Sequence, residues 1–240
     1  AENLVDLLLA QERENDLGGV ARKLKVMLDG DDPAALIRDL AAKVRSNPLL
    51  TLHIGASITG FSGHLGSYKL QFTAGGKALE AGGGAVVVAT GGVPAVTDEY
   101  SYGTAPDIVT QLELEEKLSD PAFAKGLKDV VMIQCVGSRS EKHPACDRIC
   151  CHEAVKNALA IKKVNPKARV YVLNRDIRTY GKDELNYKKA REAGVVFLRF
   201  EPGANPQVTV NGGLRVVIRD TVLQRQVALK PDLLVLSTGV

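Results

Sequence analysis

A strand, a long loop, a helix and a second strand follow one another between residues 130 and 176. VVMIQC at 130–135 is apolar enough for a buried strand, a helix is expected at about 151–164, and RVYVLNRD at 169–176 is the next strand. Strands joined through a helical crossover run parallel, because the crossover returns the chain to the same end of the sheet. The second half of the chain is therefore predicted to be an α/β domain.

The loop of this unit holds every cysteine in the chain: Cys135, Cys146, Cys150 and Cys151. A dinucleotide-binding unit would have a glycine-rich turn here, with a pyrophosphate at the helix N-terminus. This loop contains no GxGxxG. Four thiolates can instead hold an iron–sulfur cluster or a zinc ion, or include a redox-active pair such as Cys146 and Cys150. Buried, unreactive thiols are the remaining interpretation.

Two of these cysteines are adjacent, which favours a cluster over a single ion. Neighbouring residues do not readily place both sulfurs on one zinc, whereas a cubane accepts more irregular ligand directions. Cys150 and Cys151 are expected at the start of a helix, whose positive end favours thiolates and a negatively charged cluster. Arg139 and Arg148 add positive charge nearby. The residues thus favour iron and sulfide, and leave zinc and a dithiol pair open.

The first half predicts a helix at 33–46, after Asp31 and Asp32. Each half ends with a strand meander and then a strand that terminates in Thr-Gly, AVVVATGG and DLLVLSTG. We therefore predict two Rossmann-like halves, a domain over 1–95 and a domain over 104–240, joined by a Pro-rich crossing. Further strands are predicted at 49–54, 57–63, 67–73, 84–92, 195–200, 207–210, 214–220, 226–229 and 232–239, and further helices at 110–118 and 183–192.

Composition excludes some functions. The net charge of +3 is not gathered into a basic stripe, so nucleic-acid binding has little support. No apolar stretch approaches the length of a membrane span, and the N-terminus lacks the basic start of a secretory signal. A cytoplasmic protein is expected, and in a reducing compartment clustered cysteines are metal ligands or redox groups rather than structural disulfides.

QCVGSR, followed by CDRICC and HEAVKNALAIKK, resembles the A-type subunits of heterodisulfide reductases and the related subunits of quinone-interacting membrane-bound oxidoreductases. Other similar segments are VVVATGG at 86–92, YGTAPDIVTQLELEE at 102–116, VYVLNRDIRTYG at 170–181 and DLLVLSTGV at 232–240. The resemblance implies a flavoprotein of the thioredoxin-reductase type that transfers electrons through FAD and a 4Fe-4S cluster. It makes the four cysteines the cluster ligands. Ala145 and Asp147 replace an aromatic residue and a serine of the family, so the hydrogen bonding of the cluster is expected to differ.

The resemblance also places FAD contacts in the first half. Glu12 matches the acidic residue that holds the FAD ribose, Gly18 and Gly19 match the turn that follows it, and Thr90-Gly91 is a candidate flavin contact because small residues let the backbone approach a cofactor. The plainer interpretations are a solvated charge and an ordinary turn. The family's GxGxxG turn is absent, and the chain stops where the family continues. We therefore expect a fragment of a larger subunit that binds FAD weakly or not at all.

The function predicted from these observations is an electron-transfer subunit whose partners are other subunits of a complex, with a homodimer as a further candidate. The alternatives are a pyridine-nucleotide:disulfide-type oxidoreductase with a redox-active cysteine pair, and a zinc-stabilised assembly module. His143 and His152 flank the cysteines and are interpreted as surface residues. Arg175, Arg178 and Tyr180 follow the strand at 169–173, where they either contact a phosphate, a flavin or a partner, or cap the next helix.

Overall fold

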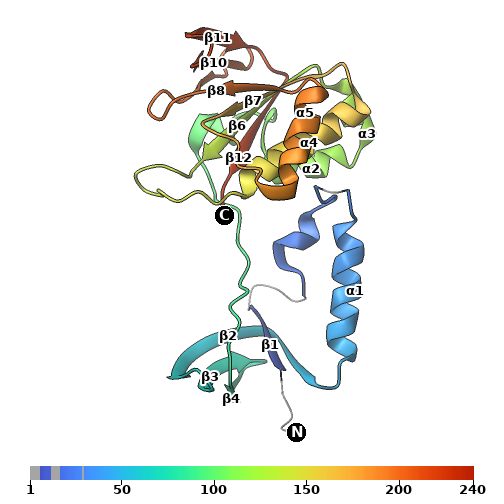
Figure 1. Ribbon diagram of the computed structural model, residues 1–240, viewed down its shortest axis with the longest axis vertical. Coiled ribbons are helices and arrows are strands. Elements are labelled where there is room, and N and C mark those ends of the chain that lie inside the picture. The colour runs from blue at the N-terminus through green and yellow to red at the C-terminus, as the bar shows by residue number, and fades with distance from the viewer. Residues whose placement is uncertain (1–5, 12–16, 29) are drawn as a thin grey trace. The chain divides into compact units, whose positions relative to one another are not determined.

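The computed structural model describes residues 6–11, 17–28 and 30–240. The chain divides into two compact units (Figure 1). Unit 1 comprises residues 1–24 and 32–92, and unit 2 comprises residues 25–31 and 93–240. The cysteines and most of the buried apolar residues belong to unit 2.

Unit 1 is organised around a sheet in the order β1-β2-β3-β4. β1 runs parallel to the start of β2, and β2, β3 and β4 form an antiparallel meander. The strands are β1 (Asp6–Gln11), β2 (Leu50–His64), β3 (Ser67–Ala74) and β4 (Lys77–Gly83). The two strands predicted at 49–54 and 57–63 are thus one continuous strand, β2.

The helix of unit 1, α1 (Pro33–Ser46), has the predicted bounds. The side chain of Asp32 accepts a hydrogen bond from the backbone N–H of Ala34 at 2.8 Å, and Pro33 occupies the first helical turn. These are the two features that stabilise a helix N-terminus, because they satisfy or remove N–H groups that have no partner within the helix. A short 3-10 helix, η1 (Gly19–Lys23), precedes α1 in the chain.

The prediction of a strand over 84–92 is wrong. The chain leaves the sheet at Gly83, and residues 85–92 form an extended segment without strand pairing. Val87 is 89% exposed and Val88 is 80% exposed. A strand needs a neighbour as well as β-branched residues, and the residues described here offer this segment no neighbour.

Unit 2 contains a five-stranded parallel sheet in the order β5-β12-β6-β7-β8 and a three-stranded antiparallel sheet in the order β11-β10-β9. Figure 1 shows helices α2 to α5 together on one side of the parallel sheet. The parallel strands are β5 (Ile108–Thr110), β6 (Asp129–Val136), β7 (Arg169–Asn174), β8 (Val196–Arg199) and β12 (Leu233–Thr238). The antiparallel strands are β9 (Gln207–Thr209), β10 (Arg215–Asp220) and β11 (Arg225–Leu229). The helices are α2 (Gln111–Leu118), α3 (Pro121–Gly126), α4 (Ile149–Val164) and α5 (Glu184–Glu192), with short 3-10 helices η2 (Glu99–Ser101) and η3 (Gly181–Asp183).

Both faces of the parallel sheet are covered. Val130 and Met132 of β6 pack in the cluster of buried residues that includes α2 and α4. Val131 and Ile133 pack in a second cluster with residues of β10. A sheet buried on both faces needs strands with continuous apolar stretches, and β6 and β12 contain VVMI and LLVL.

Residues 25–31 belong to unit 2 although they lie early in the sequence. Glu115 of α2 holds them: its Oε1 accepts hydrogen bonds from the backbone N–H of Lys25 at 2.5 Å and of Val26 at 3.1 Å. Its other oxygen lies 2.8 Å from Nζ of Lys156 on α4. One buried carboxylate thus ties this early segment to the helical layer.

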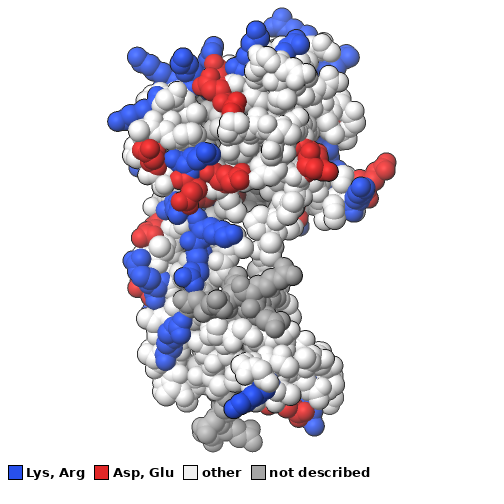
Figure 2. All heavy atoms as spheres, turned by 180° about the vertical axis from the view of Figure 1, so that it is seen from behind, with Lys and Arg blue, Asp and Glu red and all other residues white. Residues whose placement is uncertain are grey.

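Charge and hydropathy add two observations. On the face shown in Figure 2, Lys and Arg side chains are interspersed with Asp and Glu. In the part of the chain that the structure describes, no helix combines the length and the apolar character that crossing a bilayer requires.

Candidate functional site: the cysteine loop

The loop between β6 and α4 has an unusual backbone. Cys135, Arg139 and Arg148 have φ values of 63°, 53° and 64°, in the left-handed region that side chains disfavour. A residue held there costs on the order of 1–3 kcal/mol, and such residues persist only where the surrounding structure fixes them. The bend at Cys135 turns the chain out of β6 at the carboxyl edge of the sheet, where α/β proteins place their ligand sites.

Three of the four cysteines come together in the interior. Cys135 lies at the end of β6, and Cys150 and Cys151 lie in the first turn of α4; all three side chains are buried. All four cysteines of the chain are free thiols. The loop that follows β6 returns to the same edge of the sheet before α4 begins, and so places Cys135 beside Cys150 and Cys151.

The thiols differ in acidity. The hydrogen bond between Cys150 and Cys151 lowers the pKa of Cys151 to about 7, despite its burial, and raises the pKa of Cys150. Burial raises the pKa of Cys135, and the positive charge of Arg139 opposes that effect. Of these three buried thiols, Cys151 is the one most readily deprotonated, as a metal ligand must be.

Cys146 occupies a different position. It lies partly exposed within the loop, and the Arg178 guanidinium interacts electrostatically with it. The next residue, Asp147, packs against Gly239 at the end of β12, where a Cβ atom would overlap the Asp147 carboxylate. The cysteine loop thus packs, through Asp147, against Gly239, which follows Thr238 at the end of β12.

The donor set fits an iron–sulfur cluster by its chemistry. Sulfur is the ligand of such clusters, and each thiolate binds a different iron, so the sulfurs are spread apart. A single zinc ion needs all its sulfurs at about 2.3 Å from one point. Among the described residues, no three His, Cys, Asp or Glu side chains form a group that could hold one metal ion. The assignment therefore depends on the positive features: three converging buried thiols, one acidic thiol and the N-terminus of α4.

The candidate flavin contacts lie in unit 1. Glu12 lies outside the described residues. Gly18 and Gly19 form a turn with φ values of 113° and 51°, and a Cβ atom on Gly18 would lie 2.9 Å from side-chain atoms of Arg22 and Ile37. Thr90 and Gly91 lie in the exposed extended segment.

The two histidines near the cysteines have structural roles or face solvent. His152 lies on α4, with Nδ1 2.8 Å from the carbonyl oxygen of Arg148 and Nε2 3.1 Å from Oδ2 of Asp183, and its ring contacts Tyr180. His143 is exposed in the loop. Arg175 donates a hydrogen bond to the carbonyl oxygen of Arg139 at 2.6 Å, so it supports the cysteine loop directly.

Sequence reasoning missed two acidic residues and an aromatic residue beside the cysteines. Asp176 forms ion pairs with Arg139 and Arg178. Oε1 of Glu99 accepts a hydrogen bond from the backbone N–H of Gly137 at 2.9 Å, and burial beside this carboxylate raises the pKa of Tyr100 to about 12. The position of Asp176 at the end of β7, on the same sheet edge as Cys135, was the available signal.

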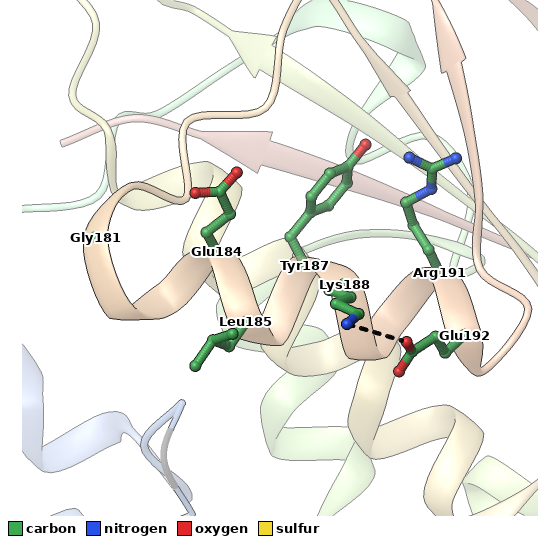
Figure 3. Close-up of a pocket in the computed structure, with 7 residues that line it drawn as sticks. All are labelled: Gly181, Glu184, Leu185, Tyr187, Lys188, Arg191 and Glu192. Carbon is green, nitrogen blue, oxygen red and sulfur yellow. Dashed lines mark ion pairs between the residues drawn. The ribbon is translucent and has the colours of Figure 1, made fainter.

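Two surface hollows lie away from the cysteines. The hollow in Figure 3, of about 550 Å³, is lined by residues of η3 and α5. Two of these residues, Lys188 and Glu192, lie one turn apart on α5 and pair at 3.8 Å. A second hollow, of about 680 Å³, is lined by residues between Tyr102 and Lys117. None of the residues lining either of these two hollows is a cysteine.

Comparison with known proteins relates this chain to a group of reductases, although no family model matches it. The chain is 38% identical over 156 residues to the A-type subunit of the H(2)/formate:CoB-CoM heterodisulfide, ferredoxin reductase of Methanococcus maripaludis. It is 39% identical over 156 residues to the A-type iron-sulfur subunit of the CoB–CoM heterodisulfide reductase of Methanocaldococcus jannaschii. Each match covers 59% of this chain and 24% of the relative. The chain thus spans about a quarter of these relatives, and the resemblance to the A-type subunits of heterodisulfide reductases is confirmed.

Solved structures confirm the fold. Thioredoxin reductase of Lactococcus lactis has a TM-score of 0.54 at 14% identity, over 97% of this chain and 69% of that one. Bacillithiol disulfide reductase of Bacillus cereus has a TM-score of 0.52 at 13% identity, with the same coverage. At these identities the likeness establishes the architecture alone, and the predicted α/β fold of the thioredoxin-reductase type is confirmed.

Proposed function

We propose that this chain is part of an electron-transfer subunit of a heterodisulfide-reductase-like oxidoreductase, and that its β6–α4 loop binds a 4Fe-4S cluster. The observation that carries the proposal is the convergence of Cys135, Cys150 and Cys151 at a strained loop on the carboxyl edge of the sheet. The similarity to reductase subunits, one of them an iron-sulfur subunit by name, supports it.

The residues have distinct roles in this proposal. Cys135, Cys146, Cys150 and Cys151 hold the cluster, which when bound accepts and donates single electrons. The burial of three of the ligands excludes water from most of the site. The N-terminus of α4 and Arg139 place positive partial and full charge beside the thiolates, which stabilises their negative charge. The cysteines are ligands in this scheme and not nucleophiles.

FAD belongs to the intact subunit in this proposal. The described candidates Gly18, Gly19, Thr90 and Gly91 are turns and exposed backbone, so we derive no step through a flavin in this chain. The partners are other subunits of a complex, because the relatives are named as subunits. The names of these relatives do not support a homodimer. A cytoplasmic location stays a prediction.

Anaerobic reconstitution tests the cluster. With iron and sulfide, the chain should bind about four irons and show broad visible absorbance that dithionite bleaches. Cys135→Ser should abolish stoichiometric iron binding, because it removes a buried ligand. His143→Ala, a change at an exposed position of the same loop, is the matched control and should bind iron as the parent does. Uptake of one zinc per chain with no iron would refute the proposal.

A dithiol oxidoreductase is the second candidate, favoured by the acidic Cys151 beside Cys150. The Cys135→Ser variant separates the two functions. It removes a cluster ligand but leaves Cys146, Cys150 and Cys151, so a dithiol enzyme that uses a pair such as Cys146 and Cys150 would keep reversible disulfide exchange after this substitution. Thiol titration of the parent and the variant under matched redox buffers provides the measurement.

A further inference from the structure

The segment that follows β7 lies against the cysteine loop. The Asp176 carboxylate pairs with the Arg139 guanidinium through one oxygen and with the Arg178 guanidinium, at 3.2 Å, through the other. Arg139 is part of the loop, and Arg178 follows β7. One carboxylate therefore joins two cations from different segments, both at the carboxyl edge of the sheet.

Arg139, Asp176 and Arg178 each interact with a cysteine. Nη1 of Arg139 lies 3.9 Å from Sγ of Cys135, within hydrogen-bonding distance for sulfur. The Cys151 thiol donates a hydrogen bond to the backbone carbonyl oxygen of Asp176, also at 3.9 Å, and a thiolate ligand would lose this bond. The backbone N–H of Arg178 donates a hydrogen bond to the same sulfur, which favours its thiolate form. The charge of Arg178 acts on Cys146. Three of the four proposed ligands thus have a partner within Arg139, Asp176 and Arg178.

We propose that Arg139, Asp176 and Arg178 are positioning residues that hold the ligand thiolates and set the reduction potential of the cluster. The inference rests on the proposed cluster site. A cation or N–H donor beside a ligand sulfur stabilises the more negative, reduced cluster, and a carboxylate destabilises it. Asp176 also neutralises part of the charge that Arg139 and Arg178 present to Cys135 and Cys146.

Removing a positive charge and removing a negative charge should shift the midpoint potential of the cluster in opposite directions. Arg139→Gln removes a positive charge and a donor beside Cys135, and should shift the midpoint potential in the negative direction. Asp176→Asn removes the negative charge but keeps the shape of the side chain, and should shift it in the positive direction. The measured step is the transfer of one electron from dithionite to the cluster, with no bond made or broken.

The experiment is an anaerobic redox titration of the reconstituted full chain, followed by visible absorbance and electron paramagnetic resonance, with iron content measured on each sample. Arg139→Lys keeps the charge and should retain both iron and most of the parent potential. Arg169→Gln is the matched control. Arg169 is the first residue of β7 and pairs with Asp129, the first residue of β6, so both lie at the opposite end of these strands from Cys135. This substitution should leave the potential unchanged.

Each outcome decides the proposal. Opposite shifts in Arg139→Gln and Asp176→Asn support it, as does loss of iron in Arg139→Gln that Arg139→Lys restores. Shifts of the same sign, or parent potentials in both variants at full iron content, overturn it. Those results would leave the cluster itself in place. Failure of the parent chain to bind iron would instead refute the proposed function, so the two failures are distinguishable.

Discussion

Lys156 and Glu115 form an ion pair inside unit 2, where the side chains are only 6% and 2% exposed. Lys156 Nζ also lies 2.9 Å from Glu153 Oε2, and Glu115 accepts two backbone hydrogen bonds from residues 25 and 26. Burying charges is costly unless they are paired and hydrogen-bonded, and here both conditions are met. Removing one partner leaves the other in a medium that cannot solvate it.

Lys156→Met is therefore expected to destabilise the chain by about 3 kcal/mol, because it strands a buried carboxylate. Urea unfolding monitored by circular dichroism provides the measurement. Lys188→Met is the control: Lys188 pairs with Glu192 at 3.8 Å on the exposed face of α5, and such pairs contribute roughly 0–1 kcal/mol. Equal losses in the two variants would show that Glu115 gains solvation by another route.

At this scale, sequence reasoning found residues whose chemistry is rare and missed those whose role depends on the fold. Four cysteines in one loop drew attention without a structure. Asp176 did not, because an aspartate after a strand is common. Its role depends on two arginines, one of which is 37 positions away in sequence. Glu99 is similar, since it meets Gly137 only because the chain returns to the cysteine loop.

Helix α2 begins with a capping box, an arrangement in which the first residues satisfy each other's free N–H groups. Thr110 Oγ1 accepts a hydrogen bond from the backbone N–H of Glu113 at 3.3 Å, and Glu113 Oε2 accepts one from the backbone N–H of Thr110 at 2.7 Å. Tyr102 donates a further bond to Glu113 at 2.9 Å. Burial opposes the charge, but the bonds from Thr110 and Tyr102 hold the pKa of Glu113 below its ordinary value of 4.5.

Thr110→Ala is expected to cost about 1 kcal/mol of stability at neutral pH, measured by urea unfolding.

The Glu113 carboxylate makes the stability of the chain depend on pH. Because the pKa of Glu113 is lower in the folded chain, its contribution is complete above pH 4.5 and is lost as the pH falls through the folded value. Glu113→Gln should weaken that decline in urea titrations from pH 7 to acid, whereas Glu192→Gln, an exposed control, should not. Parallel declines in all three proteins would contradict the assignment.

Among elements, the sequence predicted best where local signals agreed. The Asp32-Pro33 start and the 33–46 helix match α1, and the strands around the cysteine loop match β6 and β7. β4 was missed because KALEAGG has few residues that favour a strand, and it is held by its antiparallel ladder with β3. AVVVA misled in the opposite direction, since β-branched residues favour a strand only where a neighbour exists.

At the scale of the whole molecule, apolar burial is unevenly divided. Both hydrophobic clusters are built from buried residues of unit 2. Among the described residues of unit 1, the apolar side chains that are buried are Pro33, Ala56 and Phe72. Because burial of apolar surface is the main stabilising contribution, the two units should differ in stability.

The reconstituted chain is therefore expected to unfold in two transitions, unit 1 before unit 2. Hydrogen exchange read by mass spectrometry on β3 and β6 reports the two units separately. The visible absorbance of the cluster should persist through the first transition, because all four cysteines belong to unit 2. A single transition, with absorbance lost together with the protection of β3, would mean that the units unfold as one.

Of two properties of the whole chain, one could be predicted from the sequence and the other could not. The α/β class followed from the strand–loop–helix–strand pattern and is confirmed. The membership of residues 25–31 in unit 2 could not be predicted, because it depends on backbone N–H groups that meet Glu115, and backbone groups carry no sequence signal.

The exposed segment after β4 has a consequence for the behaviour of the chain in solution. AVVVA combines β-branched side chains with the absence of charge and proline, and most of its valine surface faces water. Segments of this kind pair with copies of themselves on other molecules and stack into cross-β assemblies. We therefore expect concentrated samples to form fibrils through this stretch, and a charged substitution such as Val87→Lys, which lies outside the cysteine loop, to suppress them.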